Sequence, residues 1–288
     1  MFLPRKILEE KLLRILAEDL GQGDITTSLI VPEKSTAEAE VIAKESGVIC
    51  GIEEAKILLE SLGLQVEALV RDGQKIRASQ VLLKISGKAR TLLSVERTLL
   101  NLLSRMSGIA TATKEVVEKI RKSKLKTRVA CTRKTAPGLL YFDKKAVSVG
   151  GGDTHRLHLD DMVLIKDNHI KIAGNVKKAV EKARENVSFS KKIEVEVTRV
   201  EDALTAAKSG ADIIMLDNFS PKQVKKAIKL LEKAGFREKV LLEASGGITK
   251  ENILEYASTG VDIVSLGEIT QSSRALDMSL EITRVRKH

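Results

Sequence analysis

The segment RVACTRKTAPGLLYFDKKAVSVGGGDTHRLHLDDMVLIKDNHIK (residues 128–171) decides the fold class of this chain and holds most of its candidate site. Short apolar runs at its two ends, 128–132 and 162–166, predict buried β-strands. Its cationic and imidazole side chains stand mainly at the ends of such runs: Arg133, Lys134, His155, Arg156, Lys166 and His169. Cations at strand ends with glycines between them predict a site for a substrate that carries several negative charges. A solvated basic face is the alternative, but it does not require charges spaced among strands.

Beyond this segment, strand-like and helix-like stretches alternate. Apolar runs occur at 193–197, 212–217, 240–245 and 262–267, and helical patterns at 174–185, 200–209, 221–234 and 249–258. Glycines 210, 235 and 260 stand near helix ends, where glycine is a common stop signal. Buried strands joined by helices predict a parallel sheet. Six strands in regular alternation, with no GxGxxG after the first, favour an α/β barrel over a doubly wound sheet.

A barrel of this kind places its functional residues at the carboxyl ends of the strands. In this sequence those ends carry Arg133 and Lys134, Lys166, Glu196, Asp217, Ser245-Gly246-Gly247, and Gly267-Glu268. Each apolar run therefore stops at a charged residue or a glycine. A barrel with a purely structural role does not require that regularity.

The first part of the chain reads as a separate α+β domain. Helices are predicted at 5–18 and 52–62, and strands at 37–45, 64–70 and 81–87. A helix at 89–106 carries a polar stripe that includes Arg97, and Gly108 is predicted to separate it from a second helix at 109–121. The alternating tail, 275–285, predicts a strand that leaves the barrel and pairs with the first domain. The predicted domains are 1–108 with 275–288, and 109–274.

The totals exclude several classes of protein. A net charge of +10 admits nucleic-acid binding, but aromatic residues are only 2% of the chain and do not cluster with basic ones. No apolar run reaches the length of a membrane span, and the amino terminus lacks the apolar region of a signal peptide. Cys50 and Cys131 make no metal spacing, so a reducing cytoplasm is expected. His288 is terminal, and no role is predicted for it.

Ordered motifs along almost the whole chain resemble the quinolinate phosphoribosyltransferase family. They are EDLGQGDITT (18–27), ERTLLNLLSRMSGIAT (96–111), TRKTAPGLL (132–140), GGGDTHR (150–156), LIKDNH (164–169), EVEV (194–197), MLDNF (215–219) and SGGI (245–248). The resemblance implies an N-terminal α/β sandwich domain followed by an open, TIM-like α/β barrel. It also implies a reaction in which quinolinate and phosphoribosyl pyrophosphate (PRPP) give nicotinate mononucleotide, pyrophosphate and carbon dioxide, with Mg²⁺.

The resemblance also implies roles for matching residues. Arg133, His155, Arg156 and Lys166 would hold the quinolinate carboxylates, Thr132 would contact substrate beside them, and Lys134 would face the pyrophosphate. Glu196 and Asp217 would address the ribose hydroxyls and Mg²⁺, in part through water, and Ser245, Gly246, Gly247 and Gly267 would cradle the 5-phosphate near a helix start. Lys134, Lys166, Glu196 and Asp217 would be the catalytic residues. Arg97 would come from a neighbouring subunit of a homodimer, with any further assembly left open.

Alternatives remain at this point. Lys166 could form a Schiff base, as in barrel aldolases, although nothing else in the sequence organises an aldol substrate. A relative with the same fold could use nicotinate or another small acid, and a nucleic-acid-binding protein is the alternative from a different class. Gln271 stands where members of the family often carry His, which puts one phosphate contact in doubt.

Overall fold

The computed structural model describes residues 3–286, which include the whole predicted strand 275–285, while His288 lies outside the described residues. The chain forms two compact units. The first contains the chain up to Ala112, residues 148–150, and the chain from Ser273 onward. The second contains Thr113–Val147 and Gly151–Ser272.

The first unit is built on a four-stranded antiparallel sheet in the order β12-β1-β5-β3. Its strands are β1 (Thr36–Ala43), β3 (Gln65–Ala68), β5 (Val81–Lys88) and β12 (Met278–Arg286), and β2 (Gly47–Val48) pairs separately with β4 (Lys75–Ile76). Its helices are α1 (Arg5–Leu20), α2 (Ile25–Ile30), α3 (Ile52–Ser61) and the first part of α4 (Ala89–Lys122). β12 runs antiparallel to β1, which confirms that the tail leaves the barrel and pairs with the first sheet.

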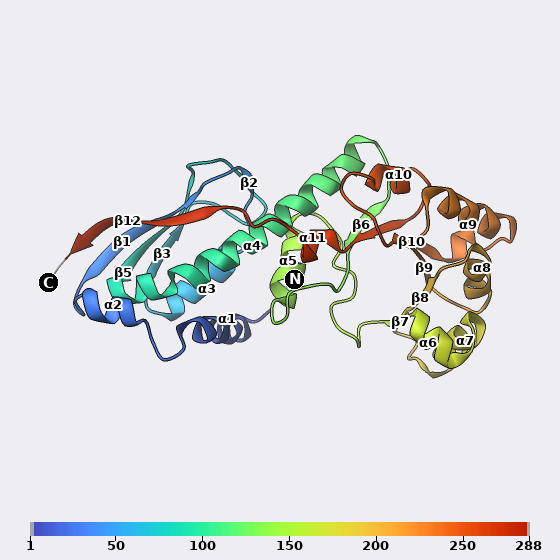
Figure 1. The fold of residues 1–288 in the computed structure, drawn as a ribbon, viewed down its shortest axis with the longest axis horizontal. Helices are drawn as coiled ribbons and strands as arrows, with labels where there is room; N and C mark the ends of the chain where they lie inside the picture. Colours follow the sequence, from blue (N-terminus) through green and yellow to red (C-terminus); the bar gives the residue numbers. More distant parts are fainter. Residues whose placement is uncertain (1–2, 287–288) are drawn as a thin grey trace. The chain divides into compact units, whose positions relative to one another are not determined.

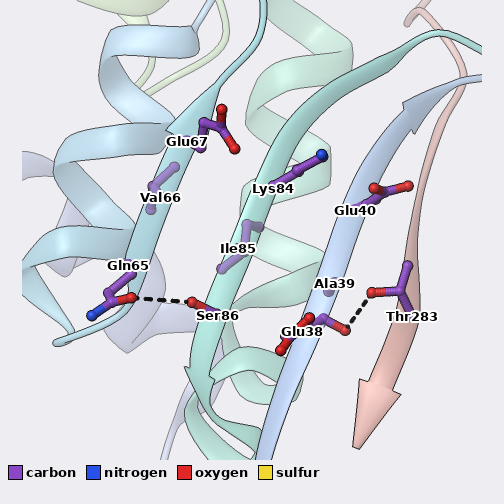
Figure 2. Close-up of a pocket in the computed structure, with 10 residues that line it drawn as sticks. All are labelled: Glu38, Ala39, Glu40, Gln65, Val66, Glu67, Lys84, Ile85, Ser86 and Thr283. Atoms are coloured by element: carbon purple, nitrogen blue, oxygen red, sulfur yellow. Dashed lines mark hydrogen bonds between the residues drawn. The ribbon is translucent and has the colours of Figure 1, made fainter.

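The two faces of this sheet differ as the alternation in β1 predicts. Ala37, Ala39, Val41 and Ala43 are buried on the face covered by α1, α3 and α4 (Figure 1). The opposite face is polar, and Figure 2 shows Glu40, Lys84 and Glu67 side by side on adjacent strands over a hollow of about 510 Å³. Cross-strand pairs of opposite charge stabilise a solvated sheet face. This hollow brings together no group of cations, so it does not fit the predicted anion site.

The second unit is built on a six-stranded parallel sheet in the order β6-β11-β10-β9-β8-β7. The strands are β6 (Arg128–Cys131), β7 (Val163–Ile165), β8 (Ile193–Val197), β9 (Ile213–Asp217), β10 (Leu241–Ser245) and β11 (Ile263–Leu266). All six predicted strands are present within about two residues of their expected bounds. Ala130 of β6 also bridges Asp153, so the chain after the glycine-rich stretch lies beside the open edge of the sheet. The architecture is the predicted open α/β barrel.

Helices follow most of the barrel strands and cover the outer face of the sheet (Figure 1). Predicted helices are present as α7 (Val176–Asn186), α8 (Val200–Lys208), α9 (Pro221–Lys233) and α10 (Ile253–Ala257), while α5 (Leu140–Val149), α6 (Asp167–Ala173), α11 (Glu268–Gln271) and the 3-10 turn η1 (Arg237–Lys239) were not predicted. The start of α9 shows why local sequence suffices here. Ser220 and Gln223 cap each other's backbone N–H groups, and Pro221 takes the first helical position.

Two features bear on the class of protein. Within residues 3–286, no helix combines the length and apolar character that crossing a bilayer requires. Cys50 and Cys131 are both buried and unbridged.

The prediction of two helices separated at Gly108 is wrong. α4 is one helix of 34 residues, because buried apolar residues continue at helical spacing through Met106, Ile109 and Val116. Gly108 does not end a helix. It allows the backbone near Arg274 to pass close to α4. A Cβ built there would lie 2.1 Å from the carbonyl oxygen of Arg274, in the segment that leads into β12.

This close approach predicts an unusual response to Gly108→Ala. In an exposed helix interior the change would stabilise the protein by up to about 1 kcal/mol, because alanine has the higher helix propensity. Here the added methyl group must push backbone aside, so we expect destabilisation of about 1–3 kcal/mol. Urea denaturation measures the change, with Asn101→Ala on the exposed side of α4 as the matched control. Equal or higher stability of Gly108→Ala would contradict the packing described.

Candidate active site

A pocket of about 480 Å³ lies in the second unit at the carboxyl ends of the barrel strands. Every predicted site residue except Arg97 lines it: Thr132, Arg133, Lys134, His155, Arg156, Lys166, Glu196, Asp217, Ser245, Gly246, Gly247 and Gly267. Arg97 is on α4 in the first unit, with an exposed side chain. Gln271 is exposed and does not line the pocket.

Strand alternation explains how polar groups enter the barrel. In β8, Ile193, Val195 and Val197 are buried on one side, while Glu194 and Glu196 occupy the other side. In β10 the same period places Glu243 on the face of Ser245. Both Glu196 and Glu243 line the pocket. The inner face of the sheet is thus polar near its carboxyl edge.

Two guanidinium groups in the pocket have no carboxylate partner. Among the described residues, neither Arg133 nor Arg156 forms an ion pair within 4.0 Å. Burial and the neighbouring charge of Arg133 lower the pKa of Arg156, although the guanidinium stays charged at neutral pH. Like charges held together in a partly buried pocket repel each other unless an anion lies between them. The pair is therefore suited to a substrate with carboxylate groups.

Lys166, another cation in the pocket, already has a carboxylate partner. The Lys166 ammonium group donates to Glu196 Oε1. The Lys166 side chain is 46% exposed, whereas that of Glu196 is 14% exposed, so the lysine is the partner that solvent or a substrate can reach more readily. In the absence of substrate each charge compensates the other.

A strained turn closes the pocket beyond β9 and β10. Gly246 and Gly247 have φ of +89° and +62°, and a Cβ at Gly246 would lie 2.4 Å from Asn218 Oδ1. Nothing lies within 4 Å of a Cβ built at Gly247, so this backbone faces open space. Backbone N–H groups in such a turn can cradle a phosphate. α10 begins only at Ile253, so these groups precede that helix and do not form its first turn, unlike the predicted helix start.

Asn218 was not predicted as a site residue. It adopts φ +56°, its N–H donates to Ser245 O at 2.8 Å, and its Nδ2 donates to Asp217 Oδ2 at 3.0 Å. It therefore links the glycine turn to the carboxylate of Asp217. The signal was present in the motif MLDNF, because asparagine is one of the few non-glycine residues common at positive φ.

Two buried glutamates, Glu194 and Glu243, were also missed. Their Oε2 atoms both lie 3.2 Å from His155 Nε2. Burial lowers the pKa of His155, but the two carboxylates outweigh it and raise that pKa to about 10. The Arg156 N–H donates to His155 Nδ1 at 2.8 Å. Only the neutral ring keeps a lone pair on that nitrogen, so this hydrogen bond opposes the rise in the pKa of His155. In both charge states Nε2 carries a proton that points towards the carboxylates. The period-two alternation of IEVEV could have revealed Glu194.

The donor set of the pocket suits a hard cation. Glu196 and Asp217 present carboxylate oxygens, and Mg²⁺ prefers oxygen ligands with several retained waters. Neither carboxylate is fully buried, which leaves room for those waters. His155, Glu194 and Glu243 form another cluster, whose ligand atoms lie within 4.8 Å of one another.

Comparisons with known proteins agree along the chain. Residues 24–107 match the family described as "Quinolinate phosphoribosyl transferase, N-terminal domain", and residues 109–281 match the corresponding C-terminal domain. The chain is 47% identical over 286 residues to the probable nicotinate-nucleotide pyrophosphorylase [carboxylating] of Methanocaldococcus jannaschii, covering 96% of this chain and 99% of that protein. It is 40% identical over 253 residues to the enzyme of that name from Rattus norvegicus, covering 88% and 84% of the two chains.

Solved structures agree as well. The nicotinate-nucleotide pyrophosphorylase of Francisella tularensis superimposes with a TM-score of 0.88 at 39% identity, covering 98% of each chain. The two domain matches, the open barrel and the ordered motifs therefore indicate the same family. This chain belongs to the quinolinate phosphoribosyltransferase family.

Proposed function

We propose that this pocket is where the chain carries out the reaction of its family, phosphoribosyl transfer from PRPP to quinolinate with decarboxylation. The unpartnered guanidinium groups of Arg133 and Arg156 carry this proposal. Quinolinate has two adjacent carboxylates, and guanidinium groups bind carboxylates through paired hydrogen bonds. Lys166 lies beside them, and His155 lies at the base of the same cluster.

The rest of the pocket fits PRPP. The backbone of Ser245, Gly246 and Gly247 would receive the 5-phosphate, with Gly267 on the next strand, and Lys134 would face the pyrophosphate next to Thr132. Glu196 and Asp217 would hold the ribose hydroxyls and Mg²⁺. When bound, the metal ion supplies positive charge that offsets the charge of the departing pyrophosphate.

The chemistry needs no nucleophilic side chain. As pyrophosphate leaves, the ribose develops positive charge, which Glu196 or Asp217 can stabilise electrostatically while the ring nitrogen of quinolinate attacks. Lys166 leaves Glu196 and binds a substrate carboxylate instead. The carboxylate of Glu196 can then face the ribose. When the adjacent carboxylate leaves as carbon dioxide, its bonding electron pair stays on the ring carbon, where the positive charge of the quaternary nitrogen stabilises it. A proton from solvent then completes the C–H bond of nicotinate mononucleotide.

A phosphoribosyltransferase that uses a monocarboxylate such as nicotinate is the alternative within this fold. Such a substrate has one carboxylate and would leave one of the two guanidinium groups unpaired. The pair Arg133 and Arg156 therefore favours the dicarboxylate.

The direct test is incubation with quinolinate, PRPP and Mg²⁺. We expect carbon dioxide and nicotinate mononucleotide in equal amounts. In the same assay, Arg133→Lys and Arg156→Lys should each lower kcat/KM for quinolinate about tenfold or more, because lysine keeps the charge and loses the paired hydrogen bonds. Product from nicotinate but not quinolinate would establish the alternative. Near-normal turnover in both variants would remove these arginines from the site.

The metal assignment has its own test. Glu196→Gln and Asp217→Asn should weaken PRPP-dependent turnover and shift the Mg²⁺ requirement to higher concentration, because amides bind hard cations more weakly than carboxylates do. Quinolinate binding without PRPP, followed by calorimetry, should stay largely intact in Asp217→Asn. If the double variant retains both its metal dependence and its PRPP affinity, the assignment of these carboxylates is wrong.

We further propose a two-fold, head-to-tail homodimer in which Arg97 completes the partner's site. Arg97 has an exposed side chain on α4, and it does not line the pocket of the second unit. The motif around it, ERTLLNLLSRMSGIAT, is part of the family resemblance. An exposed arginine at this position can reach into the pocket of a second copy of the chain.

Hybrid dimers test this proposal. Arg97→Ala and Lys166→Ala should each be nearly inactive alone. In an equal mixture with free subunit exchange, activity should return to about a quarter of wild type, because half the dimers are hybrids with one unmutated site. Subunits with different affinity tags would show that hybrids form. Background activity in proven hybrids would mean that Arg97 acts within its own chain.

A further inference from the structure

Two glutamates lie beneath the proposed dicarboxylate site without any role in the reaction described above. Glu194 in β8 and Glu243 in β10 are both fully buried. His155 Nε2 lies 3.2 Å from a carboxylate oxygen of each, and Glu194 also interacts with the charge of Arg156. Buried carboxylates are costly unless they are paired and hydrogen-bonded. Two of them next to the binding site of an anion therefore call for a physical reason.

The hydrogen bonds of His155 supply that reason. Its Nδ1 accepts the N–H of Arg156 at 2.8 Å, so its Nε2 carries a proton, which it donates to Glu243 Oε2 at 3.2 Å. Glu194 Oε2 lies 3.2 Å from the same nitrogen but accepts no hydrogen bond. A metal ion at Nε2 would need a lone pair on that nitrogen. The cluster is therefore arranged to receive a proton. Both ring nitrogens of His155, a residue that lines the pocket, therefore have partners within the protein.

The backbone around His155 is held in a costly conformation. His155 has φ +52°, a left-handed conformation that is unfavourable for a non-glycine residue. Asp153 Oδ1 accepts the His155 N–H at 2.8 Å, and the buried ammonium group of Lys144 donates to the carbonyl of Thr154. These contacts, together with the hydrogen bonds of the imidazole ring, fix the position of the Arg156 backbone.

We propose that Glu194 and Glu243 are positioning residues of the dicarboxylate site, acting through His155 on Arg156. Glu243 holds the imidazole in one orientation through its hydrogen bond with Nε2, and the nearby charge of Glu194 favours the same direction of that N–H. The Nδ1 atom then holds the peptide N–H of Arg156. This contact sets the direction in which the Arg156 guanidinium enters the pocket. The inference rests on the proposed function and assigns His155 a supporting contact in place of a direct one with substrate.

The expected signature is a selective change in quinolinate KM. Glu243→Leu removes the acceptor and should raise the KM for quinolinate about tenfold to a hundredfold, while kcat and the KM for PRPP change less than about threefold. Glu243→Gln keeps an oxygen that can accept from Nε2, so it should recover most of the affinity. Glu54→Gln, a buried glutamate on α3 in the first unit, is the matched control and should change neither KM.

A double-mutant cycle separates positioning from general damage. In the His155→Ala background, Glu243→Leu should add less than about twofold to the quinolinate KM, because its route to Arg156 is already gone. Additive effects would overturn the proposal, as would an equal rise in both KM values.

A second variant covers the case in which Glu243→Leu does not fold. His155→Asn tolerates positive φ and keeps an acceptor near the Arg156 N–H, so it should bind quinolinate more tightly than His155→Ala. Equal affinity of the two would overturn the proposal. One equivalent of a transition metal in the purified protein, lost in Glu243→Gln, would make the cluster a metal site and also overturn it. Failure of the wild-type chain to form product would instead refute the proposed function.

Discussion

The hydrogen-bonded register of six parallel strands is the constraint on which the site depends. Register pairs Asp217 with Ser245 and Ser245 with Ser265, so functional groups from successive strands stand at one edge. A shift by one residue in β8 would exchange the inner Glu194 and Glu196 for valines. The apolar residues that pack beneath the helices therefore also determine which polar residues face the pocket. Stability of the barrel and geometry of the site are two consequences of the same pairing.

Charge in the barrel is arranged in layers. Deep in the barrel, Glu243 forms a hydrogen bond with His155, and burial raises the pKa of Glu194 beside them. Nearer solvent, Lys166 and Glu196 compensate each other, and this pair can separate when substrate arrives because the lysine is partly exposed. Among the described residues that line the pocket, the side chains of Arg133, Arg156 and Lys134 form no ion pair within 4.0 Å. A polyanionic substrate thus meets uncompensated positive charge on a base of fixed charges that do not need to rearrange.

Much of this architecture could be predicted from periodicity. Apolar spacing and stop signals predicted all six barrel strands, four of their helices and the returning strand β12. Burial in a sheet or against it requires apolar residues at regular intervals, and these can be seen in the local sequence. Gly108 was misread, because glycine within a helix marks either a break or a close approach, and only the position of Arg274 distinguishes them. Glu194 and Glu243 were not predicted as site residues because they lie within strands and not at their carboxyl ends, although side-chain alternation already placed Glu194 on the same face as Glu196.

The sequence by itself determined the division into a sheet domain and a barrel, and which residue types gather at the barrel's carboxyl edge. Those properties depend on local periodicity and on ordered motifs. Only the tertiary structure decided which charges pair: Lys166 with Glu196, His155 with two buried glutamates, and Arg133 and Arg156 with none. Pairing depends on distances across strands far apart in the chain. Electrostatic energy falls with distance and changes with burial, and neither quantity is encoded in the spacing of residues along a sequence.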